Sequence, residues 1–212
     1  MRERSTVSII ASLGKLSGRW LEPDYSFRRK AVARLVNGSG LSENMAEAML
    51  DAVFGELTAP KLWKLLRSEL KDPRMLDDFR KDAPTKTRLR ARGPESILHI
   101  FSSNTPQAAV FSFVLGMLLK SRNVGKLSSR DEGFLSLYLQ SLKKADPGLW
   151  RTNVLISPKD RAAFSAHAKT AGLVVAYGSD ESIAQIRKEV PASTPFLPTA
   201  TVSAQRCIPK KR

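Results

Sequence analysis

The feature that most constrains the fold is a change of pattern near residue 93. Beyond this point, short runs of β-favouring residues alternate with segments of helical periodicity over about 100 residues. Strands that are each followed by a helix are typical of a parallel sheet, because parallel strands need long crossover connections. The sequence therefore predicts a Rossmann-like, doubly wound parallel α/β sheet, with strands at 96–101, 123–129, 153–157 and 172–177. The helix after the third of these strands is expected to begin at Pro158.

Residues 1–92 are predicted to be an N-terminal helical segment. One helix covers 27–36, and Ser42 is the expected N-cap of the next helix. A third helix begins near Pro60, and a basic stretch bounded by prolines, 83–94, is predicted to be a linker or surface strand. The inward face of the second helix is expected to consist of Met45, Met49, Val53 and Phe54.

The strong positive charge limits the classes of partner. A net charge of +15 suits nucleic acid, anionic membranes or polyphosphate cofactors. The basic clusters at 27–34, 86–92 and 209–212 lie in separate segments with few aromatic residues between them. No helix-turn-helix pair, zinc-ligand cluster or aromatic RNA-binding motif accompanies them. Nucleic acid is therefore the less favoured partner, and it stays open as an alternative.

Three features predict a cytoplasmic location. The single cysteine, Cys207, excludes an internal disulfide and fits a reducing compartment. The N-terminus does not resemble a signal peptide. The longest apolar run, 108–119, is shorter than the roughly 20 residues of a membrane-spanning helix.

A strand, a Gly-Ser turn and an acidic helix start form the first candidate site. Gly178 allows close approach to the backbone, and Ser179 places a hydroxyl beside unpaired helix N–H groups. Ligands of open α/β sheets bind outside the carboxyl ends of the strands, where this turn is expected. A serine that merely caps the helix is the alternative, and no GxGxxG motif is present.

Two further polar turns follow other predicted strands. Lys126, Ser128 and Ser129 supply one cation and two hydroxyls, which suit a ribose or phosphate; a solvated lysine before a capping serine is the alternative. Asn104 can present a side-chain amide to a cleft as an oxyanion donor, or it can simply form the turn before a helix. His99 is predicted to be a structural residue, either packed or half-exposed, and no metal site is predicted.

The order of these turns resembles the cofactor half of the aldehyde dehydrogenase superfamily. The sequence is most similar to the acyl-CoA reductase family, the fatty-acid reductase component of bacterial bioluminescence systems. The similar stretches are ILHIFSSNTPQAAVFSFVLGMLLKSRNVGKLSSRD, DPGLW and VVAYGSDESIAQIRKEVP, with RWLEPD, FRRKAV and GLSENMAEAMLDAVF nearer the N-terminus. The resemblance covers roughly residues 16–198 and implies an aldehyde-dehydrogenase-like cofactor domain over 93–198.

The resemblance also implies a chemistry. A cysteine thiolate takes the acyl group from an acyl-CoA or acyl-protein substrate, NADPH delivers hydride to the thioester, and a fatty aldehyde leaves. By position, Asn104 corresponds to the oxyanion-stabilising asparagine. Lys126, Ser128 and Ser129 correspond to the ribose and phosphate contacts of NADP, and Gly178 and Ser179 to its pyrophosphate turn. Acyl-transferring or synthetase subunits are the partners that such an enzyme implies.

The resemblance stops after Pro198. Related proteins continue with a segment like His-Gly-His-Lys-Ile-Ser and a catalytic domain that bears the nucleophilic cysteine. We therefore expect a truncated fold in which 199–212 is an aberrant basic tail, and codons read in another frame are compatible with a frameshift. Cys207 is then an accidental thiol, and the chain alone is expected to be inactive. A nucleotide-binding or regulatory module without catalysis is the alternative function.

Overall fold

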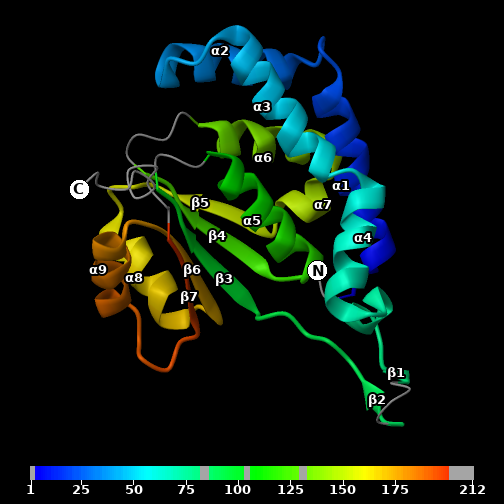
Figure 1. The fold of residues 1–212 in the computed structure, drawn as a ribbon. Coiled ribbons are helices and arrows are strands. Elements are labelled where there is room, and N and C mark those ends of the chain that lie inside the picture. The colour runs from blue at the N-terminus through cyan, green and yellow to red at the C-terminus, as the bar shows by residue number, and fades with distance from the viewer. Residues whose placement is uncertain (1–2, 82–85, 103–105, 129–132, 201–212) are drawn as a thin grey trace, which may run out of the picture.

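The computed structural model describes residues 3–81, 86–102, 106–128 and 133–200, and its sheet confirms the predicted fold class (Figure 1). Five parallel strands lie in the order β5-β4-β3-β6-β7. The chain starts in the centre, moves outward to one edge, and then returns past β3 to build the other side, as in Rossmann sheets. The strands are β3 (Ser96–Ile100), β4 (Arg122–Lys126), β5 (Asn153–Ile156), β6 (Leu173–Gly178) and β7 (Phe196–Ala200).

Helices cover both faces of the sheet. On one face, Leu98 and Ile100 of β3 pack in a cluster with Phe164 of α8. On the other face, the rings of His99 and Phe101 lie against Phe113 of α5, with centroids 4.9 and 6.0 Å away. The helices after β3 are α5 (Pro106–Leu118), α6 (Phe134–Ala145), α7 (Pro147–Trp150), α8 (Arg161–Thr170) and α9 (Asp180–Glu189).

The N-terminal helices pack onto the α5 and α6 side of the sheet, and one apolar cluster runs through both parts (Figure 1). A small antiparallel pair of strands, β1 (Arg80–Lys81) and β2 (Arg88–Leu89), projects from them, and β2 is the surface strand predicted within 83–94. The boundary between residues 92 and 93 stays a prediction. The helices are α1 (Thr6–Leu21), α2 (Ser26–Ser39), α3 (Glu43–Glu56), α4 (Ala59–Leu70) and the 3-10 helix η1 (Pro73–Leu76).

Trp20 joins the N-terminal helices to α6. Its side chain is fully buried, and its ring stacks on Phe54 of α3 with centroids 4.5 Å apart. The indole Nε1 donates a hydrogen bond to Ser141 Oγ of α6 at 2.9 Å. A large ring with its one polar atom satisfied is well suited to the centre of a core.

His99 is buried and not half-exposed, and it lies in a chain of polar side chains beneath α5. Its Nε2 lies 3.0 Å from Asn123 Oδ1, and its Nδ1 lies 2.7 Å from Ser112 Oγ. Asn123 Nδ2 donates to Asn153 Oδ1 at 2.8 Å, so Asn123 Oδ1 must accept and His99 Nε2 carries the proton. Gly116 leaves room for this amide, because a Cβ there would lie 1.8 Å from Asn123 Oδ1.

The structure corrects three local expectations. Met45 is 58% exposed, and Ala46 and Leu50 face the core instead, because the buried stripe of α3 is rotated by one residue. Helix α8 begins at Arg161 and not at Pro158, since the Asp160 carboxylate caps it. Strand β7 is absent from the sequence expectations because Pro198 disfavours a strand; β7 is an edge strand, where proline is tolerated. The Ser42 cap is confirmed.

Replacing Trp20 tests the junction between the helices and the sheet. We expect Trp20→Ala to lower the free energy of unfolding by about 3–5 kcal/mol, because it leaves a large cavity and removes the hydrogen bond that the indole donates to Ser141. Chemical denaturation measures the change. Trp63→Ala is the control, because Trp63 is only partly buried and its loss is expected to be smaller. Equal losses for the two variants would contradict the central role of Trp20.

Stability is expected to fall as the pH is lowered from 7 to 5. Burial lowers the pKa of His99 to about 4, while the hydrogen bond with Asn123 opposes the shift. Between this value and the ordinary pKa near 6.5, the unfolded chain binds the extra proton, so acid favours unfolding. Between pH 7 and pH 5, this histidine is expected to lower the free energy of unfolding by about 2 kcal/mol.

Denaturation curves of the chain and of His99→Gln at the two pH values measure the effect of this histidine. The variant keeps hydrogen-bonding groups but does not titrate, so its stability is expected to change much less. A variant with the same loss between pH 7 and 5 as the unaltered chain would rule out His99 as the source.

Candidate functional site

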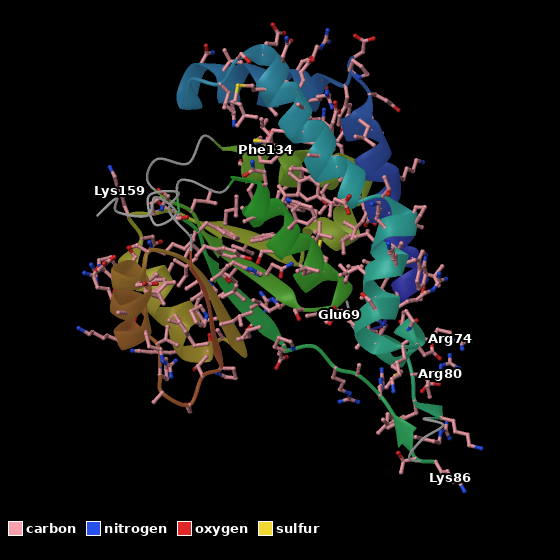
Figure 2. All side chains as sticks on the ribbon, viewed as in Figure 1. Glu69, Arg74, Arg80, Lys86, Phe134 and Lys159 are labelled. Atoms are coloured by element: carbon pink, nitrogen blue, oxygen red, sulfur yellow. The ribbon has the colours of Figure 1, made fainter. Side chains whose placement is uncertain are left out.

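A pocket of about 700 Å³ opens at the carboxyl end of the sheet. It lies where β3 and β6 adjoin and where the direction of chain growth reverses, the usual ligand site of such sheets. Lys159 marks this end of the sheet in Figure 2. The lining of this carboxyl-end pocket consists of Ile100, Phe101, Ser102, Lys126, Leu127, Ser128, Pro158, Lys159, Arg161, Phe164, Tyr177, Gly178, Ser179, Ser182, Ile186 and Glu189.

Four residues singled out from the sequence line this one pocket. Lys126 and Ser128 come from the end of β4, and Gly178 and Ser179 come from the end of β6. The two strands are far apart in sequence, and each pairs with β3. Asn104 and Ser129 lie outside the described residues. The roles of all six residues stay predictions, although the geometry places four of them around the same space.

The turn from β6 into α9 is tightly built. Gly178 is buried, and a Cβ at this position would lie 3.3 Å from Ser182 Cβ, so the first turn of the helix comes close to the strand. Ser179 caps α9, because its Oγ accepts from the Ser182 N–H at 3.3 Å. Ser179 and Ser182 both line the pocket, so the N-terminus of α9 adjoins it.

The pocket also contains two cations that the sequence expectations missed. Lys159 and Arg161 follow β5 directly, in the sequence PKDR. Arg161 pairs with Glu189 at 3.4 Å, but both side chains are largely exposed, so solvent weakens the pair. Basic residues directly after a predicted strand were the available signal. With Lys126, the pocket holds three cations against the single carboxylate of Glu189.

Aromatic rings provide the apolar part of the lining. Phe101 directly follows β3, and Tyr177 is the last residue but one of the neighbouring strand β6. Their rings stack with centroids 5.5 Å apart. Lys126 Nζ lies 5.5 Å from the centroid of the Phe164 ring, which holds the ammonium group over the pocket floor. Flat apolar surfaces beside cations and hydroxyls suit a ligand that has both an aromatic ring and phosphate groups.

Among residues 3–81, 86–102, 106–128 and 133–200, no three His, Cys, Asp or Glu side chains are grouped to hold a metal ion. Within the same residues, no helix is both long and apolar enough to cross a membrane.

The fold is similar to solved aldehyde dehydrogenases. A NAD-dependent benzaldehyde dehydrogenase from Corynebacterium glutamicum superposes with a TM-score of 0.69 at 11% identity, over 93% of this chain and 42% of that one. A succinic semialdehyde dehydrogenase from Streptococcus pyogenes, solved with NADP+ as its cofactor, gives 0.61 at 13% identity, over 92% and 45%. At these identities the likeness shows the fold alone.

Sequence comparison places the chain more specifically, among the acyl-CoA reductases. A long-chain acyl-protein thioester reductase of Photorhabdus luminescens is 25% identical over 190 residues, which are 87% of this chain and 39% of that protein. The chain therefore spans about two fifths of the length of this curated relative. The model of one protein family, acyl-CoA reductase (LuxC), matches residues 1–198. Since the match covers nearly the whole chain, the chain belongs to the LuxC family of acyl-CoA reductases.

Proposed function

We propose that this chain supplies the NADPH-binding part of a cytoplasmic acyl-CoA reductase that converts a fatty acyl thioester into its aldehyde. The observation that carries the proposal is the carboxyl-end pocket, where Lys126, Ser128, Gly178 and Ser179 meet at the switch point of the sheet. Family membership supports a reductase, and the NADP+ complex of a structural neighbour supports a nicotinamide cofactor. An acyl-CoA or acyl-protein is the proposed substrate, with acyl-transferring or synthetase subunits as partners.

The charges of the pocket favour NADP over NAD. Many NAD-binding Rossmann sheets place a carboxylate near the end of the second strand, where it binds the ribose 2′-hydroxyl. Here β4 is the second strand of the sheet, and it ends in Lys126. Lys159 and Arg161 lie across the same pocket. Cations at these positions attract the 2′-phosphate that only NADP carries.

In the proposed function, the cofactor and the protein have separate roles. NADPH supplies the hydride when bound, and the residues of this chain hold and orient it. Ser179 and the N-terminus of α9 face the pyrophosphate in this proposal, and Lys126 faces the ribose or its phosphate. The Asn104 amide, in the segment after the central strand, is the proposed donor to the oxyanion of the thioester. Cys207, the one cysteine of the sequence, lies outside the described residues.

Titration with NADPH, followed by its fluorescence, tests the proposal. We expect Lys126→Ala and Ser179→Ala each to weaken binding about tenfold, because each removes a polar contact to the phosphates. Lys143→Ala is a matched control: Lys143 also lies over an aromatic ring, that of Trp150, but outside the pocket. The control is expected to bind NADPH as the unaltered chain does.

Two results would contradict this function. One is the absence of a saturable NADPH signal together with DNA binding that falls steeply between a low and a high salt concentration, which would indicate a nucleic-acid-binding protein. The other is NADPH binding that neither pocket variant changes. A separate assay with acyl-CoA shows whether the 212 residues reduce the thioester without other chains.

The choice of cofactor is tested by a second pair of substitutions. We expect Lys159→Gln combined with Arg161→Gln to reduce the ratio of NADPH to NADH affinity by about tenfold, since the 2′-phosphate loses two cations. NADH binding itself is expected to change little. Lys169→Gln is the control, because Lys169 lies on the same helix as Arg161 but outside the pocket. An unchanged ratio of NADPH to NADH affinity would show that these cations do not bind the 2′-phosphate.

A further inference from the structure

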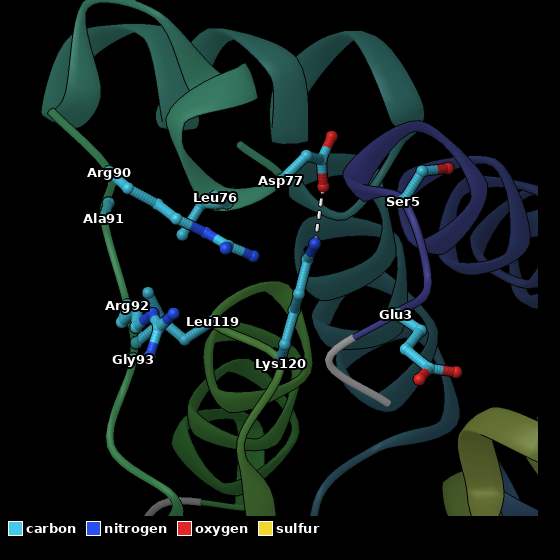
Figure 3. Close-up of a pocket in the computed structure, with 10 residues that line it drawn as sticks. All are labelled: Glu3, Ser5, Leu76, Asp77, Arg90, Ala91, Arg92, Gly93, Leu119 and Lys120. Atoms are coloured by element: carbon cyan, nitrogen blue, oxygen red, sulfur yellow. Dashed lines mark hydrogen bonds and ion pairs between the residues drawn. The ribbon is translucent and has the colours of Figure 1, made fainter. Parts of the chain in front are cut away.

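A second pocket, of about 390 Å³, lies at the opposite end of the sheet (Figure 3). Gly93 lies shortly before β3 and Lys120 shortly before β4, so this pocket is at the amino ends of the strands. It shares no lining residue with the carboxyl-end pocket. The lining of this amino-end pocket consists of Glu3, Ser5, Leu76, Asp77, Arg90, Ala91, Arg92, Gly93, Leu119 and Lys120.

One wall of the amino-end pocket is an ion pair between the buried Lys120 and the partly buried Asp77. The Asp77 carboxylate accepts hydrogen bonds from the backbone N–H and the hydroxyl of Thr6, both at 2.8 Å, and from Lys120 Nζ. Burial acts to raise the pKa of Asp77, but the bonds from Lys120 and Thr6 outweigh it and keep the pKa below its usual value. Lys120 is only 8% exposed. Its ammonium group is paired with the Asp77 carboxylate, which balances its charge.

The other wall carries two arginines without a matching carboxylate. Neither Arg90 nor Arg92 forms an ion pair with any described residue. Arg90 is partly buried, and Figure 3 shows its guanidinium extending across the pocket toward the pair of Lys120 and Asp77. Glu3 is the one other acidic residue in the lining, and its carboxylate points away from Arg90. The pocket therefore has an excess of positive charge.

The backbone that carries the arginines is held in place. A Cβ added to Gly93 would lie 2.5 Å from the carbonyl oxygen of Leu119, so the segment 90–93 packs directly on the end of α5. Ala91 N–H donates to the carbonyl oxygen of Met75 at 2.9 Å, which ties the same segment to η1. The two arginines thus belong to a segment whose backbone is positioned by η1 and the end of α5.

We propose that the amino-end pocket binds a small phosphate monoester. Guanidinium groups pair with phosphate oxygens through parallel hydrogen bonds, and two of them can share a dianionic phosphate. Leu76, Ala91 and Leu119 supply an apolar part of the wall for the group esterified to the phosphate. The volume fits a small metabolite. A bound phosphate also links the segment 90–93 to α5 and so stabilises the junction between the helical part and the sheet.

Thermal unfolding and isothermal titration of the whole chain test the proposal, with phenyl phosphate, inorganic phosphate and benzoate as probes at one ionic strength. We expect phenyl phosphate to bind most tightly, and the double variant Arg90→Gln/Arg92→Gln to bind it at least about tenfold more weakly. Lys81→Gln/Arg88→Gln removes the same two charges from the exposed strands β1 and β2 and is expected to bind normally. Lys126→Ala, in the carboxyl-end pocket, is also expected to bind normally.

Amide chemical shifts of the unaltered chain locate the ligand without a variant. Shifts that saturate with phenyl phosphate at Ala91, Gly93 and Leu119 support the proposal even if the arginine variant fails to fold. The proposal is overturned by shifts confined to the carboxyl-end pocket, or by no saturable binding of phenyl phosphate. An equal loss in the Lys81→Gln/Arg88→Gln control would also overturn it, since binding would then follow total charge. If inorganic phosphate binds as tightly as the ester, the apolar wall has no part and the ester proposal fails.

Discussion

The fold depends on covering the central strand β3 on both faces. Leu98 and Ile100 need apolar partners on one side, and His99 and Phe101 need partners on the other, since a central parallel strand has no face for water. Helices must therefore lie on both sides of the sheet, and the chain must return past β3 from β5 to β6. That return creates the switch point, and with it the crevice that becomes the carboxyl-end pocket.

Two sets of polar side chains inside this apolar framework have their hydrogen bonds satisfied. Burial keeps the His99 imidazole neutral, and the chain from His99 through Asn123 to Asn153 gives both of its ring nitrogens a partner. The pair of Lys120 and Asp77 is satisfied in the same manner at the amino end of the sheet. A buried polar group left without a partner costs about 1–3 kcal/mol, more than the roughly 1 kcal/mol that one hydrogen bond contributes. These sets thus fix how the helices and strands register with one another.

Local residue patterns predicted much of the carboxyl-end pocket. Gly178 and Ser179 come at the end of an apolar strand, just before an acidic helix start. Lys126 also comes at the end of an apolar strand. Each of these two patterns spans no more than about ten consecutive residues, so it can be recognised locally. Lys159 and Arg161 were missed because their relevance depends on β5 lying beside β4, which no local pattern states. Arg90 and Lys120 were missed for the same reason, since 30 residues of chain separate the two walls of their pocket. Strand β7 was missed because pairing at the edge of the sheet overrides the local effect of Pro198.

The sequence by itself determined the class of fold, most element positions and the chemical character of the turns after β4 and β6. These depend on periodicity, capping and turn chemistry, which act between near neighbours in the chain. The tertiary structure alone decided the strand order, the exposure of Met45 and the burial of Leu50, and which cations share a pocket. Such choices depend on packing between segments far apart in sequence, where the rotation of a helix by one residue decides which side chains leave water.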